Sequence, residues 1–189
     1  MKVCVLGING YLGSSIAKYL IQSSHTVIGT SRNQIDFDKT DASEKLQNFL
    51  DYEKPNFVVN AIGNIDSKTD SPVKMFNAIF LPNYLIFQYY KNKYIEKNTY
   101  IWSLGSNSAG KPRAEYPMYA ALKEAETALL QTVQEIFKNS KLKWFHSIFP
   151  RLSGGLGSNP NISNSDTDYN LIGAEIEKII NNFEQSSVS

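Results

Sequence analysis

Two side chains that can exchange protons, Tyr119 and Lys123, stand four residues apart in the sequence. On a helix, residues at this spacing lie on one face, one above the other. An ammonium beside a phenol stabilises the phenolate, so such a tyrosine becomes usable as a proton donor and acceptor near neutral pH. The pair predicts acid–base chemistry, although the same spacing also arises by chance on many helices.

A hydroxyl lies where it could assist this tyrosine. Ser106 follows the apolar segment 99–104, thirteen residues before Tyr119. In a parallel sheet, ligands bind at the carboxyl ends of the strands. We expect the Ser106 hydroxyl to hold the oxygen of a substrate carbonyl beside the phenol.

Three glycines, Gly7, Gly10 and Gly13, recur every three residues between the apolar segment 2–6 and the amphipathic segment 12–21. A strand, a sharp glycine turn and a helix N-terminus form a site for a diphosphate, and a side chain at Gly10 would block its approach. The alternative is a purely structural turn. The residues of this turn that we expect to bind a dinucleotide are Gly7, Asn9, Gly10, Tyr11, Leu12 and Gly13.

The second predicted strand ends without the acidic residue that usually binds the ribose of NAD. Ser31 and Arg32 follow it instead, and the first acid is Asp36. A guanidinium can pair with a 2′-phosphate. The sequence therefore favours NADP(H), with NAD(H) also possible, while a solvated Arg32 is the alternative interpretation.

A further predicted strand ends in Asn60, Ala61 and Ile62. Residues near this end are small enough for a cofactor to lie against it. Asn77 lies in the helical segment that follows.

The elements that must position these residues alternate along the chain. Apolar runs predict strands at 2–6, 26–30, 56–62, 99–104 and 142–149, with a possible short strand at 34–37. Helical periodicity predicts helices at 12–21, 43–52, 72–94, 116–137 and 171–183, and Pro82 should interrupt the third. The pattern indicates an α/β fold: one doubly wound parallel sheet (Rossmann fold) in a three-layer α/β/α single domain spanning 1–189. Residues 154–170 are expected to form a surface loop or a mobile flap over the site.

Composition narrows the function classes. The chain has 189 residues, a net charge of +1, 42% hydrophobic residues and no apolar run long enough for a membrane span. Near-neutral charge argues against nucleic-acid binding. The single Cys4 suggests a reducing, cytoplasmic location, and His25 and His146 do not form a metal motif.

Together these motifs resemble the short-chain dehydrogenase/reductase family, from about residue 2 to residue 152. The spacing of the three glycines looks like the extended, sugar-nucleotide-modifying branch. The segment 104–110, leading to Tyr119 and Lys123, looks more like the short oxidoreductase branch.

The resemblance implies roles for these residues. Tyr119 would be the acid/base, Lys123 would hold the nicotinamide ribose and tune the tyrosine, and Ser106 would orient the carbonyl. Asn77 would position the water of a proton relay. Ser103 is a rival for the serine role, but its spacing of sixteen from Tyr119 fits less well.

The same resemblance implies further contacts to the cofactor. Asp38 is similar to the family's adenine-contacting aspartate, with Asp36 as a competitor. Pro150 occupies the place of a proline beside the nicotinamide. The family often has glycine after that proline, whereas this chain has Arg151. Arg151 could bind a small anionic or sugar-derived substrate. Arg113 and Lys111 could take part in this binding, with solvated surface positions as the alternative interpretation.

The sequence therefore favours an NADP(H)-dependent oxidoreductase that moves hydride between the nicotinamide and a carbonyl or alcohol. Two alternatives stay open: a sugar-nucleotide epimerase, dehydratase or reductase of the extended branch, and a non-enzymatic dinucleotide-sensing regulator. The resemblance also implies a homodimer through the helices that follow the predicted strands 56–62 and 99–104.

Overall fold

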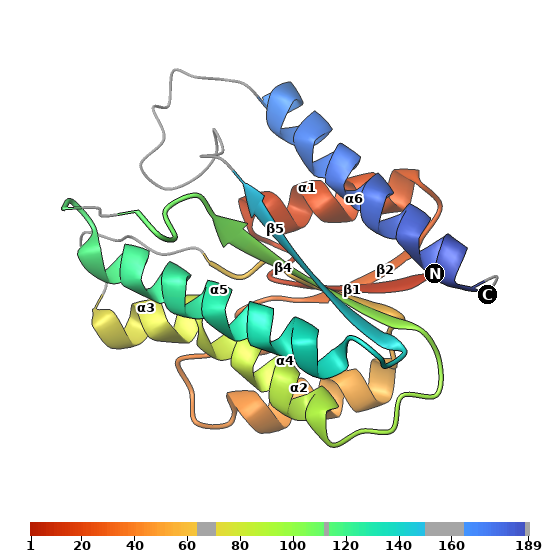
Figure 1. Ribbon diagram of the computed structural model, residues 1–189, viewed down its shortest axis with the longest axis horizontal. Helices are drawn as coiled ribbons and strands as arrows, with labels where there is room; N and C mark the ends of the chain where they lie inside the picture. Colours follow the sequence, from red (N-terminus) through yellow and green to blue (C-terminus); the bar gives the residue numbers. More distant parts are fainter. Residues whose placement is uncertain (64–70, 112–113, 150–164, 188–189) are drawn as a thin grey trace.

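The computed structural model describes residues 1–63, 71–111, 114–149 and 165–187, and in the last helix it describes the side chains of residues 170–182. Five parallel strands form one sheet in the order β2-β1-β3-β4-β5 (Figure 1). The strands are β1 (Lys2–Leu6), β2 (Thr26–Thr30), β3 (Phe57–Asn60), β4 (Thr99–Ser106) and β5 (Leu142–Phe149). The doubly wound parallel sheet predicted from the sequence is confirmed.

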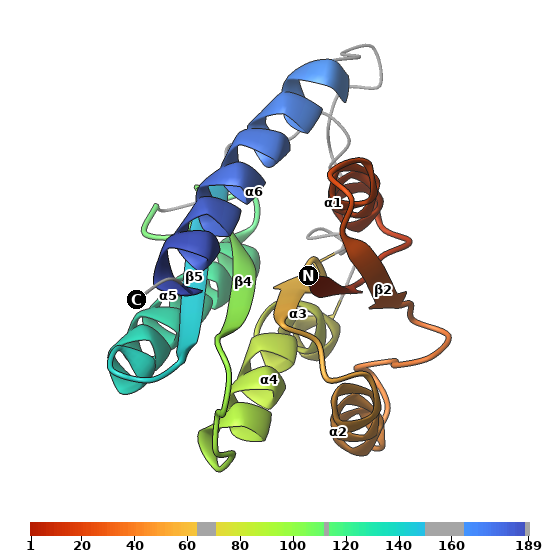
Figure 2. The same ribbon diagram turned by 90° about the vertical axis from the view of Figure 1, so that its right-hand side faces the viewer.

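Helices cover both faces of this sheet, as Figure 2 shows. One face carries α1 (Tyr11–Gln22) and α6 (Ser165–Ser187). The other carries α2 (Ala42–Glu53), α3 (Pro72–Ile79), α4 (Leu81–Lys91) and α5 (Pro117–Phe137). The three-layer arrangement follows from strands that are apolar on both faces and need a cover on each.

Alternate residues of the central strand enter two separate cores. On β1, Val3 and Val5 pack with α1 and α6, whereas Cys4 and Leu6 pack with α2, α4 and α5. All four of these residues are fully buried. The near-continuous apolar run at 2–6 is therefore the signature of a strand with helices on both sides.

Two segments differ from the sequence prediction. Residues 34–37 form a loop, in which Ile35 and Phe37 are buried against the core beneath α2 and α4. Their alternation reflects this packing and not strand pairing. The predicted loop 154–170 is helical from Ser165 onward, because α6 begins there, and its remaining residues lie outside the described part of the chain.

The predicted interruption at Pro82 is confirmed. α3 ends at Ile79 and α4 begins at Leu81, with Pro82 in the first turn of α4. Proline lacks the N–H that would continue the hydrogen-bond ladder, so the chain restarts as a new helix there. The break separates the part of this segment that faces the site from the part that packs into the core.

The sheet order reverses beside β1, since β2 lies on one side of it and β3 on the other. In doubly wound sheets, the crevice at the carboxyl ends of such strands is where ligands bind. The fold thus places the glycine turn after β1, the end of β2 and the end of β3 around one crevice.

Candidate functional site

The turn after β1 is held by the neighbouring strand. Gly7 N–H and Ile8 N–H both donate to the Thr30 carbonyl, at 2.9 and 3.1 Å. Gly7 has φ +80°, a conformation that favours glycine. Gly10 N–H donates to the Gly7 carbonyl at 2.9 Å, and α1 begins at the next residue. The first N–H groups of α1, which no helical carbonyl can satisfy, therefore lie at the crevice.

Gly13 allows the helix to approach this turn. A Cβ at Gly13 would lie 2.2 Å from the Gly7 carbonyl oxygen, a distance that no real side chain adopts. The turn and helix are thus packed backbone against backbone. This close packing is the geometry that a diphosphate-binding glycine turn requires.

A cavity of about 260 Å³ opens directly above the glycine turn. The turn after β1, the end of β2 and the loop after it, the end of β3, and α3 all contribute to its wall. Its predicted cofactor-binding members are Gly7, Asn9, Gly10, Ser31, Arg32, Asp38, Ala61 and Ile62. The glycine turn in its wall has the backbone arrangement that binds the diphosphate of a dinucleotide in doubly wound folds. The structure thus brings together residues that the sequence spreads over more than fifty positions.

Arg32, in the wall of this cavity, is paired with two carboxylates. Its guanidinium forms ion pairs with Asp38 and, through Nε at 3.3 Å, with Asp36. Its side chain remains 64% exposed. The sequence predicts Arg32 as a partner for a 2′-phosphate, and the fold also gives it two carboxylate partners from the loop that follows.

Asn77 lies on the same side as Asp38. Its amide Nδ2 donates to Asp38 Oδ1 at 3.1 Å, and it lines the cavity with Lys74 and Ala78. The hydrogen bond described for Asn77 is therefore made to Asp38, another residue that lines the cavity. Its predicted part in a proton relay stays a prediction.

Tyr119 lies in the first turn of α5, and Lys123 lies one turn further along. Tyr119 is half-buried against Met75 and Ile79 of α3. Lys123 is only 6% exposed, and its Nζ donates to the Leu104 carbonyl of β4 at 3.3 Å. The ammonium therefore reaches the carboxyl end of β4, two residues before Ser106.

The two serines of β4, Ser103 and Ser106, differ in burial and in hydrogen bonding. Ser103 is fully buried; its hydroxyl donates to Asn83 Oδ1 at 2.7 Å and accepts from Trp144 Nε1 at 2.9 Å. Ser106 is half-buried at the strand end, where its oxygen accepts from Ser108 N–H at 3.2 Å. Only Ser106 keeps a hydroxyl hydrogen that can be donated to a ligand at the strand end.

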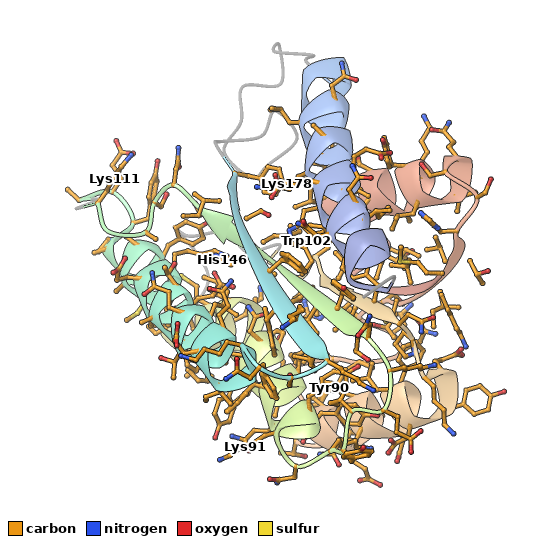
Figure 3. All side chains as sticks on the ribbon, turned by 45° about the vertical axis from the view of Figure 1, so that its right-hand side comes forward. Tyr90, Lys91, Trp102, Lys111, His146 and Lys178 are labelled. Atoms are coloured by element: carbon orange, nitrogen blue, oxygen red, sulfur yellow. The ribbon has the colours of Figure 1, made fainter. Side chains whose placement is uncertain are left out.

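His146 lies on the α5 side of the sheet, whereas Trp102 lies beneath α6 (Figure 3). Burial and the nearby charge of Lys123 lower the pKa of His146 to about 4. Its Nε2 is buried without a hydrogen-bond partner among the described residues, and a Cβ on Gly105 would lie 2.2 Å from it. His146 is thus a neutral imidazole packed onto a glycine of β4.

Sequence reasoning missed two polar residues of this region, Asn83 and Glu126. Both are buried, at 0% and 2% exposure. A signal for Glu126 was available, since it falls on the helical stripe that continues through Leu130, Val133 and Phe137, all of them buried. A charged residue on an apolar stripe indicates a buried partner.

Three predicted contacts, Arg113, Pro150 and Arg151, lie outside the described residues. Lys111 is exposed at the tip of the segment before α5 (Figure 3). It borders an open depression with Pro117 and Glu124.

Within the described ranges, no cluster of His, Cys, Asp and Glu could hold a metal ion, and no helix is long and apolar enough to cross a bilayer.

Solved structures share this fold. A short chain dehydrogenase from Burkholderia cenocepacia, in complex with NADP, superposes with a TM-score of 0.79 over 93% of this chain and 84% of its own, at 12% identity. Serine dehydrogenase from Escherichia coli gives 0.71 over 91% and 89%, at 18% identity. UDP-rhamnose synthase from Acanthamoeba polyphaga mimivirus gives 0.62 over 79% of this chain but 56% of its own, at 15% identity. At these identities the likeness is one of fold.

No curated protein matches the sequence. The model of the NAD dependent epimerase/dehydratase family, however, matches residues 3–140, which is well over half of the chain. The glycine turn, the cavity above it and the Tyr–Lys helix all fall within this match. The chain therefore belongs to the NAD dependent epimerase/dehydratase family of the short-chain dehydrogenases/reductases, which are NAD(P)-dependent enzymes.

Proposed function

We propose that this enzyme is an NADP(H)-dependent oxidoreductase acting on the carbonyl or alcohol of a small substrate. The observation that carries the proposal is the meeting of α5 with the end of β4. There the Lys123 ammonium lies at the Leu104 carbonyl, with Ser106 two residues beyond and Tyr119 one helical turn before. This position of Lys123 supports a site in which a proton donor, a cation and a hydroxyl act together at the carboxyl end of β4.

In this proposal each residue has one task. The bound dinucleotide supplies or accepts the hydride at its nicotinamide. Tyr119 gives a proton to the carbonyl oxygen during reduction, or takes it from the alcohol during oxidation. Lys123 stabilises the phenolate that remains, and Ser106 donates its hydroxyl hydrogen to the same substrate oxygen.

The preference for NADP(H) rests on Arg32. Exposed ion pairs contribute about 0–1 kcal/mol, so Asp36 and Asp38 hold the guanidinium only weakly. A 2′-phosphate carries more charge than either carboxylate and can accept two of its N–H bonds. If the two aspartates instead retain Arg32, they favour a free ribose, and the enzyme would prefer NAD(H).

The test is a fluorescence titration of the purified full chain with NADPH and with NADH. Arg32→Ala should weaken NADPH binding selectively, by about tenfold for the loss of one charged hydrogen-bond pair. Tyr119→Phe should bind as the unchanged protein does. Lys45→Ala is the matched control, because Lys45 forms an exposed ion pair with Asp41 away from the cavity.

The same titration can contradict the proposal. If the folded protein binds neither dinucleotide, the oxidoreductase assignment fails. If it prefers NADH and Arg32→Ala removes no selectivity, the cofactor preference fails while the oxidoreductase assignment stands.

A sugar-nucleotide epimerase or dehydratase is the second candidate, favoured by the family match and by the glycine spacing. Such an enzyme returns its cofactor to the starting redox state in each cycle. Net accumulation of oxidised or reduced dinucleotide during turnover therefore separates the two candidates. A regulator without catalysis would be favoured instead if Tyr119→Phe kept full biological activity.

A further inference from the structure

A chain of buried polar groups runs from the wall of the dinucleotide cavity to Lys123. Ile62 N–H donates to Asn60 Oδ1 at 3.3 Å, and Asn60 Nδ2 donates to Asn83 Oδ1 at 2.8 Å. Asn83 Nδ2 donates to Glu126 Oε1 at 2.7 Å, and Lys123 Nζ donates to Glu126 Oε2 at 2.8 Å. The side chains come from β3, α4 and α5, so only the packed fold makes this connection.

The last link is a buried ion pair. The side chains of Lys123 and Glu126 are 7% and 3% exposed. Glu135, in the last turn of α5, pairs with Lys138 at the C-cap of this helix. The pair has the same sequence spacing in the reverse order and the same distance of 2.8 Å, but its side chains are 73% and 61% exposed. The two pairs differ in burial, so the second is a natural control for the first.

Stability alone does not account for the buried pair. Replacing a buried ion pair by apolar residues of similar volume is often neutral or stabilising, because each charge loses its hydration. Burial correspondingly raises the pKa of Glu126, against the opposing charge and hydrogen bonds of Lys123 and Asn83. Leu130 and Val133, which continue the stripe, show that apolar side chains suit this face of α5.

The contacts fix the orientation of the Glu126 carboxylate. Each of its oxygens accepts a hydrogen bond from a different element, one from Asn83 and one from Lys123. Asn83 is itself held, since its Oδ1 accepts from both Asn60 and Ser103. The amide can therefore donate to Glu126 in only one orientation.

The carboxylate in turn determines where the ammonium stands. Lys123 Nζ lies between Glu126 Oε2 and the Leu104 carbonyl, at the end of β4. We propose that Glu126 is a positioning residue, which holds the Lys123 ammonium in place for the nicotinamide ribose and for Tyr119. This inference rests on the function proposed above, because it assigns Glu126 to the machinery of that site.

The experiment compares NADPH binding by the unchanged protein and by the variants Glu126→Gln, Glu126→Asp and Glu135→Gln. Glu126→Gln keeps the shape of the side chain but removes the counter-charge, and we expect about tenfold weaker binding at pH 7. Glu135→Gln should bind as the unchanged protein does. Circular dichroism and thermal unfolding verify that each variant is folded at the temperature of the titration.

The pH profile distinguishes positioning from a structural role. Besides Glu126, Lys123 faces His146 from β5 and Tyr119 one turn earlier, with the neutral Asn83 beyond the carboxylate. Without Glu126, a buried ammonium favours its neutral form. The binding deficit of Glu126→Gln should therefore grow between pH 7 and pH 9, whereas that of Glu126→Asp, which keeps the charge, should not.

The outcomes are separable. If the unchanged protein binds NADPH and Glu126→Gln binds equally well at every pH, Glu126 has no positioning role and the proposed function is untouched. If Glu126→Gln does not fold, Glu126→Asp decides: at least threefold weaker binding supports the proposal, and equal binding overturns it. If the unchanged protein does not bind NADPH, the proposed function and this inference fall together.

Discussion

At the scale of single residues, the site depends on glycines, because the lack of a side chain lets neighbouring groups pack closely against them. Gly13 lets α1 rest on the carbonyl of Gly7, and Gly105 leaves room for the ring of His146. In each case a single methyl group would occupy space that a neighbouring group already fills. Small substitutions at these two positions should therefore have large effects.

Gly13→Ala is expected to shift α1 away from the glycine turn. The added Cβ would lie 2.2 Å from the Gly7 oxygen, and overpacking of this kind costs about 1–3 kcal/mol. Thermal unfolding should show the loss of stability, and an NADPH titration should show weaker binding. Ser14→Ala, at the next, exposed position, should change neither measurement appreciably.

His146 predicts a dependence of stability on pH. Its pKa is lowered to about 4 in the folded protein, whereas an unfolded histidine titrates near 6.5. Between these values the unfolded chain binds more protons, so the free energy of unfolding should fall as pH drops from about 6.5 to about 4. In His146→Gln, urea unfolding should show a smaller decrease over this window. An identical decrease would mean that His146 is solvated and titrates normally.

At the scale of elements, α5 and α6 have different roles on opposite faces of the sheet. α5 carries the Tyr–Lys pair and the buried Glu126, whereas α6 packs over β4, β5 and α1. Ser147 of β5 donates to Glu175 at 2.6 Å, and Tyr19 of α1 donates to Glu177 at 2.6 Å. Polar contacts from two elements thus anchor α6 where its apolar stripe covers the core.

At Gly173 the backbone of α6 packs closely on the Tyr19 ring of α1. A Cβ there would lie 2.5 Å from the Tyr19 ring, which is rigid and hydrogen-bonded to Glu177. Gly173→Val should therefore destabilise the protein by about 1–3 kcal/mol. Ala174→Val adds a branched side chain at the adjacent exposed position and should cost less than about 1 kcal/mol. Equal denaturation midpoints for the two variants would show that α6 does not pack closely at Gly173.

At the scale of the whole molecule, the cavity and the helix that carries Tyr119 and Lys123 both lie at the carboxyl ends of the strands. The cavity lies at the ends of β1, β2 and β3, and the lysine reaches the end of β4. The buried polar chain joins these two regions through the interior. The proposed dinucleotide, bound across both regions, would contact the carboxyl ends of β1, β2, β3 and β4.

We propose that the homodimer expected from the family resemblance uses the exposed aromatic face of α3 and α4. Phe76, Phe80 and Tyr84 stack at centroid distances of 5.2 and 6.2 Å, and Phe76 and Tyr84 are each 39% exposed. Light scattering after size exclusion should give the mass of a dimer for the unchanged protein and a monomer for Phe76→Lys/Tyr84→Lys. Tyr52→Lys, an 84% exposed aromatic on α2, is the control and should leave the dimer intact.

A monomeric mass for the unchanged protein at micromolar concentration would rule out this dimer. A dimer that survives Phe76→Lys/Tyr84→Lys would locate the interface elsewhere on the molecule.

Most of the fold is predictable from local patterns. The strands at 2–6, 26–30 and 142–149 were delimited correctly, because an apolar run bounded by turns needs only short-range information. The glycine turn and the break at Pro82 follow from the backbone properties of single residues. The alternation at 34–37 predicts a possible strand where the structure has a loop, because alternation in sequence does not reveal whether a neighbouring strand exists to pair with it.

The partners of the polar side chains, by contrast, were decided by the tertiary structure. The sequence alone indicated Arg32, Tyr119 and Lys123 as chemically important, since residue type and helical spacing suffice for that. It could not show that Arg32 is paired with two aspartates, or that Lys123 is tied to Glu126. These contacts depend on which side chains the packed layers bring within about 3 Å and on how much water they exclude, and both are properties of the assembled sheet and helices.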